Sequence, residues 1–276
     1  MADTRMSDFG NVPVPIATSF LHQYANWNRL KTVCLTFDQD WAPDFMLTEI
    51  LDLLDRYNAK ATFLATGPSE ALSGRASAAG HEIALHPNLA AGSTQGRDLY
   101  GIITGLKKAF PQAVGTRFHL LGHSYRDLMA LSQHGFKYDV SSLRFNCPYL
   151  LPVWHADINM TLLSYCWEDG FAVEGTFPGT LETISLDFPG LKIFNFHPLN
   201  VYLNCESAGQ KSAFQSAIPD MTRCTAEEAT AFRKQGNGSG RVLRELLQVL
   251  EQRQVKCVTL GDLVSAFTNE NRDLNY

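Results

Sequence analysis

The chain of 276 residues lacks long apolar runs and clusters of basic residues. No run is long and apolar enough to span a bilayer, and residues 1–20 do not show the charged-then-apolar layout of a secretory signal. The net charge is −5, so nothing indicates a nucleic acid or an anionic membrane as partner. The sequence therefore predicts a soluble cytoplasmic protein with no stable membrane insertion and no nucleic-acid partner.

Closely spaced cysteines are also missing. The six cysteines are scattered along the chain without CxxC spacing. This pattern argues against both a zinc ribbon and a disulfide framework. Buried free thiols in the cytoplasm are the simplest interpretation. The hydrophobic content of 45%, with 11% aromatic residues, is ample for a sizeable core.

Strand-like and helix-like segments alternate along the chain. Repeated β–α units of this length predict a parallel sheet, and seven or eight strands favour its closure into a barrel. The expected fold class is therefore α/β, as a distorted (β/α)7–8 barrel. Strand-like segments are expected at residues 31–37, 59–66, 81–86, 116–121, 137–142, 162–169, 191–198 and 255–260.

The domain organisation follows from composition. We expect one barrel domain over residues 32–276, with residues 1–31 as an N-terminal extension packed on it. Residues 200–238 are polar and rich in turn-forming residues, which predicts an insertion or lid and not a second domain. Residues 240–254 then form a strongly amphipathic helix.

Residues suited to metal binding and acid–base chemistry follow many of the expected strands. In parallel α/β folds, chemistry gathers at the carboxyl ends of the strands. These ends carry Asp38 and Asp40, Thr66, His86, Arg117 and His119, Glu168 and Asp169, and His197.

Two of these carboxylates, Asp38 and Asp40, are one residue apart at the end of a strand-forming run. They lie on the same side if the extended conformation continues. Two like charges this close repel each other unless something cationic lies beside them. One interpretation is a pair of solvated loop aspartates. The other is a metal-bound aspartate beside a catalytic one.

Five segments in order carry a resemblance to a known family. They are "TFDQDWAP", "GHEIALHPN", "TRFHLLGHS", "YCWEDG" and "KIFNFHP". They resemble the five motifs of the polysaccharide deacetylase family (carbohydrate esterase family 4), in a divergent branch associated with O-antigen and cell-surface polysaccharide biosynthesis. The resemblance covers about residues 32–265. It implies a distorted (β/α) barrel, a single divalent metal ion and hydrolysis of an N-acyl group on a sugar.

The resemblance implies a metal site with one departure from the family pattern. Asp40 and His86 match metal ligands, but Ala90 stands where the family commonly has a second histidine. His119 is the best replacement, with His123 and Asn88 as alternatives. His81 is a further candidate, but it opens its strand and is expected at the other end. The implied ion is zinc, with cobalt, nickel or manganese as alternatives. An Asp and two His with open positions make a reasonable catalytic site.

The resemblance also implies the catalytic residues. Asp38 resembles the base, which Arg117 pairs with and keeps charged. His197 resembles the general acid, and Asp169 is its acidic partner. Two further residues are expected to contact substrate: Trp167 as the aromatic wall of the groove, and Leu120 through a backbone N–H near the oxyanion.

The expected activity is hydrolysis of the acetyl or formyl group of an N-acyl amino sugar. A small nucleotide-linked or lipid-linked precursor of surface polysaccharide is the natural substrate for a cytoplasmic enzyme. Two other functions stay open on the sequence alone. One is a non-catalytic, sugar-binding member of the family. The other is a metal-dependent hydrolase of a different non-peptide C–N bond.

Overall fold

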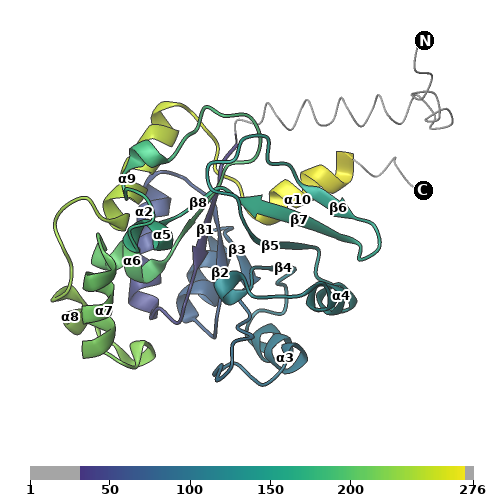
Figure 1. Ribbon diagram of the computed structural model, residues 1–276, viewed down its shortest axis with the longest axis horizontal. Coiled ribbons are helices and arrows are strands. Elements are labelled where there is room, and N and C mark those ends of the chain that lie inside the picture. The colour runs from purple at the N-terminus through teal and green to yellow at the C-terminus, as the bar shows by residue number, and fades with distance from the viewer. Residues whose placement is uncertain (1–31, 271–276) are drawn as a thin grey trace, which may run out of the picture.

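The computed structural model describes residues 32–270, which form a nine-stranded sheet with helices around it (Figure 1). The predicted extension, residues 1–31, lies outside the described residues. The strand order is β6-β7-β5-β4-β3-β2-β1-β9-β8, and β6 is antiparallel to β7 while the other pairs are parallel. The strands are β1 (Cys34–Asp38), β2 (Ala61–Ala65), β3 (Glu82–Leu85), β4 (Gly115–Thr116), β5 (Tyr138–Leu143), β6 (Val153–His155), β7 (Met160–Tyr165), β8 (Trp167–Glu168) and β9 (Ile193–Phe196).

The sheet curls until its two ends are linked. Strand β7 pairs with β5 near one edge of the sheet, and β8 pairs with β9 at the other edge. Only Cys166 separates β7 from β8 along the chain. The Cys166 N–H donates to the Ile193 carbonyl oxygen over 2.9 Å, which continues this link. The predicted distorted α/β barrel is confirmed.

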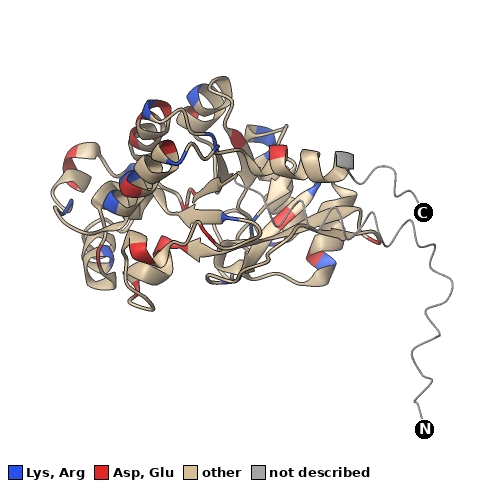
Figure 2. Cartoon of the chain, turned by 90° about the horizontal axis from the view of Figure 1, so that it is seen from above, with Lys and Arg blue, Asp and Glu red and all other residues tan. Residues whose placement is uncertain are grey.

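Helices cover the outside of the sheet. The longest, α9, buries its apolar face because its leucines and valine recur at helical spacing. The helices are α2 (Asp44–Arg56), η1 (Ala71–Ala76), α3 (Leu99–Ala109), η2 (His119–Leu121), α4 (Tyr125–Gln133), α5 (Asp169–Val173), η3 (Leu181–Thr183), α6 (Pro198–Leu203), α7 (Ala208–Ala217), η4 (Met221–Arg223), α8 (Ala226–Thr230), α9 (Ser239–Gln252) and α10 (Leu260–Glu270). Lysines and arginines lie among aspartates and glutamates on these outer helices (Figure 2).

Two segments expected as strands differ in the structure. Of residues 116–121, only Thr116 belongs to a strand, because the His119 N–H bonds to the Pro87 carbonyl oxygen and the chain then turns. Residues 255–260 contribute one isolated bridge, between Val33 and Cys257. Both segments therefore bring side chains to an end of the barrel without extending the sheet.

The segment 200–238 is largely helical. Helices α7 and α8 pack around Phe214, which is 0% exposed, and this small core continues onto α6 and α2 through Leu203 and Met46. Among the described residues, no helix has the length and apolar character needed to cross a membrane.

Candidate active site

The site lies where the parallel strands end. Asp38 is the last residue of β1, and His86, Arg117 and His197 directly follow β3, β4 and β9. The carboxyl ends of parallel strands meet at one end of a barrel, so residues far apart in sequence converge there. The side chains of Asp38, His86 and Arg117 are buried.

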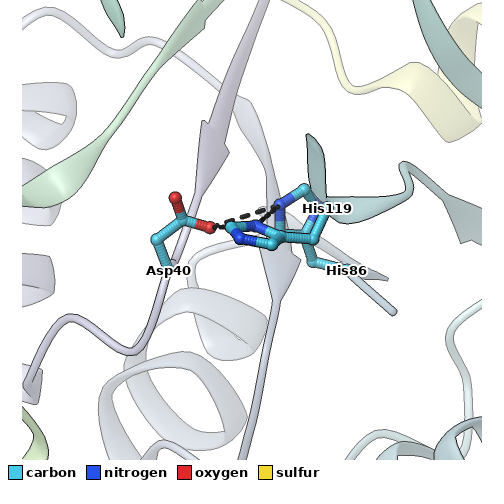
Figure 3. A group of neighbouring side chains, drawn as sticks. All are labelled: Asp40, His86 and His119. Carbon is cyan, nitrogen blue, oxygen red and sulfur yellow. Dashed lines mark hydrogen bonds and ion pairs between the residues drawn. The ribbon is translucent and has the colours of Figure 1, made fainter. Parts of the chain in front are cut away.

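Asp40, His86 and His119 form a compact triangle of potential ligand atoms (Figure 3). The Asp40 Oδ1 lies 3.3 Å from His86 Nε2 and 3.1 Å from His119 Nδ1. The two ring nitrogens are 3.3 Å apart. Among the described residues, this is the one group of three His, Cys, Asp or Glu side chains close enough to share an ion.

The tautomer of His86 is set by its other nitrogen. Nδ1 lies 2.6 Å from the Arg117 carbonyl oxygen, which only accepts hydrogen bonds, so Nδ1 carries the proton. Nε2 is therefore the ring atom that faces the triangle, where its lone pair can bind a cation when the ring is neutral. Gln95 supports the same loop, because its Nε2 donates to the His86 carbonyl oxygen over 3.0 Å.

The triangle fits a small divalent cation. Ligands about 2.0–2.2 Å from a tetrahedral zinc ion are separated from one another by roughly 3.3–3.6 Å, close to the distances found here. A carboxylate and two imidazoles are also suitable donors for such an ion. Burial opposes ionisation of Asp40, but hydrogen bonds from His119 and His86 outweigh it and hold the pKa of this carboxyl well below its usual range. Asp40 therefore offers a charged oxygen.

The two alternative ligands lie elsewhere. His123 stacks on Phe118, with ring centroids 4.9 Å apart, and its side chain is exposed. The side-chain oxygen of Asn88 accepts from the Ala90 N–H over 2.9 Å. The structure thus brings His119, and neither alternative, beside Asp40 and His86.

Each of the two loops that carry Asp40 and His119 has two consecutive non-glycine residues with positive φ. Asp40 and Trp41 have φ of 46° and 58°, and Leu120 and Leu121 have φ of 55° and 57°. Non-glycine residues rarely adopt this left-handed region, which costs about 1–3 kcal/mol each. The Trp41 N–H donates to the Thr66 hydroxyl over 2.8 Å, which helps to hold the first loop in place.

Asp38 is held by two donors. Arg117 Nη1 donates to Asp38 Oδ1, and Asn195 Nδ2 donates to Asp38 Oδ2, both over 2.8 Å. Arg117 Nη1 also donates to the Asn195 side-chain oxygen over 2.6 Å, which closes a three-residue ring. Burial opposes the charge on Asp38, but the Arg117 guanidinium together with His86 and His197 outweighs it, and the pKa of this carboxyl is lowered. Asp38 is thus kept as a carboxylate with a fixed orientation.

Arg117 is itself fully buried. Its Nε donates to the Val140 carbonyl oxygen over 3.2 Å, and its guanidinium carbon lies 4.3 Å from the centre of the Tyr165 ring. No acceptor among residues 32–270 contacts its Nη2. The arginine is therefore part of the interior of the site and not a surface ion pair.

His197 and Asp169 form a second charged pair. His197 Nδ1 lies 2.6 Å from Asp169 Oδ1, and the Asp169 oxygens also accept from the His197 backbone N–H. Burial disfavours the charged ring, but Asp169 outweighs it and raises the pKa of His197 to about 10. The other ring nitrogen, Nε2, faces the metal triangle at 3.8 Å from Asp40 Oδ2.

The two predicted substrate contacts have different surroundings. Leu120 is 77% exposed in the turn after His119, so it lies at the mouth of the site. Trp167 is 0% exposed and packs against Phe196 with ring centroids 5.1 Å apart. The structure thus places the indole in the core and not on an open groove wall, because β8 turns this side of the strand inward.

Several residues of the site were not predicted from the sequence. Asn195 bridges Arg117 and Asp38, and Thr36, which pairs with Asn195 across β1 and β9, accepts from Arg117 over 3.1 Å. A sequence signal existed, since Thr36 and Asn195 each precede a predicted site residue by two positions. The period of a strand puts such residues on the same face.

Comparisons with known proteins agree with this geometry. A family model described as WbmS-like polysaccharide deacetylase matches residues 35–215. A structure of an inferred polysaccharide deacetylase involved in O-antigen biosynthesis (WbmS) from Bordetella bronchiseptica is 25% identical, with a TM-score of 0.71, over 83% of this chain and 94% of that chain. A search of curated protein sequences finds no match.

A second solved structure supports the fold. It is an inferred polysaccharide deacetylase from Mycobacterium smegmatis, which is 18% identical with a TM-score of 0.51 over 88% of this chain and 93% of that chain. The matched family segment runs from the second residue of β1 to beyond β9 and includes every residue of the metal triangle and of the two charged pairs. The chain belongs to the WbmS-like family of polysaccharide deacetylases.

Proposed function

We propose that the protein hydrolyses the N-acyl group of an amino sugar, with a divalent cation held by Asp40, His86 and His119. When bound, such a cation polarises the amide carbonyl and lowers the pKa of a water molecule. The observation that carries the proposal is that two pairs of opposite charge, Asp38–Arg117 and His197–Asp169, both lie next to the metal triangle.

The first pair suits a general base. Asp38 is 4% exposed and accepts hydrogen bonds on both oxygens, so its orientation is fixed. Its Oδ2 lies 3.9 Å from His86 Nε2, which puts it next to the metal triangle. In the proposed reaction Asp38 accepts a proton from the attacking water, and Arg117 stays paired to it and balances its charge.

The second pair suits a general acid. The amine is a poor leaving group until it is protonated. With Nδ1 bound to Asp169, His197 presents its Nε2 proton towards the reacting centre beside Asp40. Asp169 positions the ring and stabilises its charged form. Binding of a sugar alone needs no such acid–base pair, so these contacts support an enzyme over a sugar-binding protein.

The proposed substrate is an N-acetyl or N-formyl amino sugar linked to a nucleotide or a lipid. The similarity to a structure described for O-antigen biosynthesis supports a precursor of surface polysaccharide. Zinc is the proposed ion, because an Asp and two His are typical of zinc centres with open positions.

The test combines metal analysis with hydrolysis assays. Protein purified without chelator, then loaded with zinc, cobalt, nickel or manganese, is assayed with UDP-N-acetylglucosamine, UDP-N-acetylgalactosamine and their N-formyl counterparts. Undecaprenyl-linked forms of the same sugars complete the panel. We expect stoichiometric metal and release of the free amine together with acetate or formate. Failure to bind any of the ions, or hydrolysis of cyclic amides in place of these sugars, would overturn the proposal.

A further inference from the structure

Strand β5 has one residue more than the strand β7 with which it pairs. Asp139 pairs with Leu162 of β7. The next pair is Ser142 with Ser164, so three steps along β5 match two along β7. Residues 140–141 therefore face a single residue of β7 and form a bulge. Bulges are common next to active sites, where they redirect side chains.

Both residues of this bulge hold parts of the candidate site. The Val140 carbonyl oxygen accepts from Arg117 Nε over 3.2 Å. The Ser141 hydroxyl oxygen accepts from the Phe118 backbone N–H over 2.8 Å. Arg117 pairs with the proposed base, and Phe118 immediately precedes His119 of the metal triangle. The bulge thus contacts the chain just before a proposed metal ligand.

The stretch that leads to His119 is tied to β5 by few contacts. On the β3 side, the backbone N–H groups of residues 117 and 119 donate to the carbonyl oxygens of Leu85 (3.0 Å) and Pro87 (2.9 Å). On the β5 side, backbone pairing with β4 stops at Thr116. Among residues 32–270, the Ser141 hydroxyl is the one β5 acceptor for a backbone N–H of residues 117–119. It continues the ladder where the backbone pairing ends.

Asp139 fixes the direction of the Ser141 hydroxyl. Asp139 Oδ2 accepts from this hydroxyl over 2.9 Å and from the Thr116 hydroxyl over 2.8 Å, and Oδ1 accepts from the Ser141 N–H over 2.9 Å. A hydroxyl has one proton and two lone pairs. Because the proton points to Asp139, a lone pair remains for the Phe118 N–H.

We propose that Ser141, oriented by Asp139, is a positioning residue of the metal site, because it fixes the loop that brings His119 to the other two ligands. Phe118 is 0% exposed, so its N–H has no access to water. Without the Ser141 hydroxyl this buried donor is unpaired, a cost that the loop can relieve only by moving. Such a shift carries His119 Nδ1 away from Asp40 Oδ1, from which it is now 3.1 Å. The inference rests on the proposed function.

The test measures zinc affinity in wild type, Ser141→Ala and Ser142→Ala. Competition with a chelator of known affinity gives the zinc dissociation constants, and thermal scans of the metal-free proteins record their folding. In Ser141→Ala we expect zinc binding to weaken about 10-fold, the lower end of the range for residues that orient metal ligands. Ser142→Ala removes a hydroxyl one residue further along β5 that has no hydrogen-bond partner within the described part of the chain. We expect this control to keep wild-type affinity.

Two further measurements separate positioning from stability. Ser141→Cys nearly keeps the volume but accepts hydrogen bonds weakly, so it gives the same test with less change in packing, and we expect an affinity between those of wild type and Ser141→Ala. The visible spectrum of bound cobalt reports the coordination geometry, and we expect it to change in Ser141→Ala and not in Ser142→Ala.

A Ser141 that only stabilises the fold gives a different result. Both Ser141 variants then melt at a lower temperature, while their zinc affinity and cobalt spectrum stay as in wild type. That result overturns the inference alone. A wild type that binds neither zinc nor cobalt contradicts the proposed function, and the inference with it.

Discussion

Strand β3 has a histidine near each end, and the two have opposite surroundings. His81 precedes the strand, and its Nδ1 accepts from the Ala61 N–H over 3.2 Å, while Nε2 has no partner among the described residues. Burial lowers the pKa of His81 to about 4. Burial acts on His86 as well, but Asp38 and Asp40 outweigh it and raise the pKa of that ring. The charges around each end of the strand, and not the residue type, decide what a histidine does there.

The carboxylates show the same contrast. Glu82, at the start of β3, receives hydrogen bonds from Thr62 (2.8 Å), Tyr138 (2.8 Å) and the Gly261 N–H (2.7 Å). All of these donors come from the protein, and they tie the beginning of α10 to the sheet. At the other end of the barrel, the carboxylates pair with cationic side chains, Asp38 with Arg117 and Asp169 with His197. Glu82 joins parts of the fold at one end, whereas the carboxylates at the other end pair with the side chains of the site.

The largest expected effect comes from His86→Ala. We expect metal content and hydrolysis both to fall to background, because one of three ligand atoms is lost, while the melting temperature of the metal-free protein changes little. The matched control is His81→Ala at the other end of the strand, which retains metal and turnover but melts at a lower temperature. Elemental analysis and a thermal scan measure both. Equal metal loss in the two variants would contradict the contrast between the ends.

Asp38→Asn comes next in size. We expect kcat to fall about 10²- to 10⁴-fold, the range for loss of a general base, with metal content retained. Asparagine also loses the charged pair with Arg117, so the variant's melting temperature is recorded with its rate. Retention of more than about a tenth of the wild-type kcat would argue against Asp38 as the base.

Glu82→Ala tests the opposite end. Three donors lose their acceptor, so we expect the free energy of unfolding to fall by about 2–4 kcal/mol. We expect kcat per folded molecule to be unchanged, because Glu82 lies at the amino end of the strands. Urea unfolding and active-site-normalised rates separate the two quantities. A fall in kcat with unchanged stability would reverse the assignment of the two ends.

His81 provides the smallest and most specific effect, a pH dependence of stability. The pKa of His81 is about 4 in the folded protein and about 6.5 in the unfolded chain. Its contribution to the free energy of unfolding is therefore complete above pH 6.5 and is lost as the pH falls towards 4. We expect wild type to lose about 1–3 kcal/mol more than His81→Gln between pH 7 and pH 4. If the free energy of unfolding changes equally with pH in wild type and in His81→Gln, the fold does not keep His81 neutral.

Much of this architecture was predictable from local pattern. Alternating strand and helix segments predicted the barrel, and polar residues after strands predicted which end carries the site. The segment after Thr116 was predicted wrongly as a strand. Its apolar composition suits a strand, but residues 119–121 form a short turn in which Leu120 and Leu121 adopt left-handed backbone angles, and strand propensity does not register the tertiary context that allows this.

The sequence by itself determined the α/β barrel, the family and the strand ends at which Asp38, Asp40, His86, Arg117 and His197 lie. The barrel and the strand ends follow from residue periodicity and from the direction of parallel strands, whereas the family follows from the resemblance of the five motifs. Only the tertiary structure decided that His119 joins Asp40 and His86, because the left-handed turn at Leu120 and Leu121 separates it from His123. It also decided that Trp167 is core. Both outcomes depend on which neighbours surround a strand end, and no local pattern encodes that.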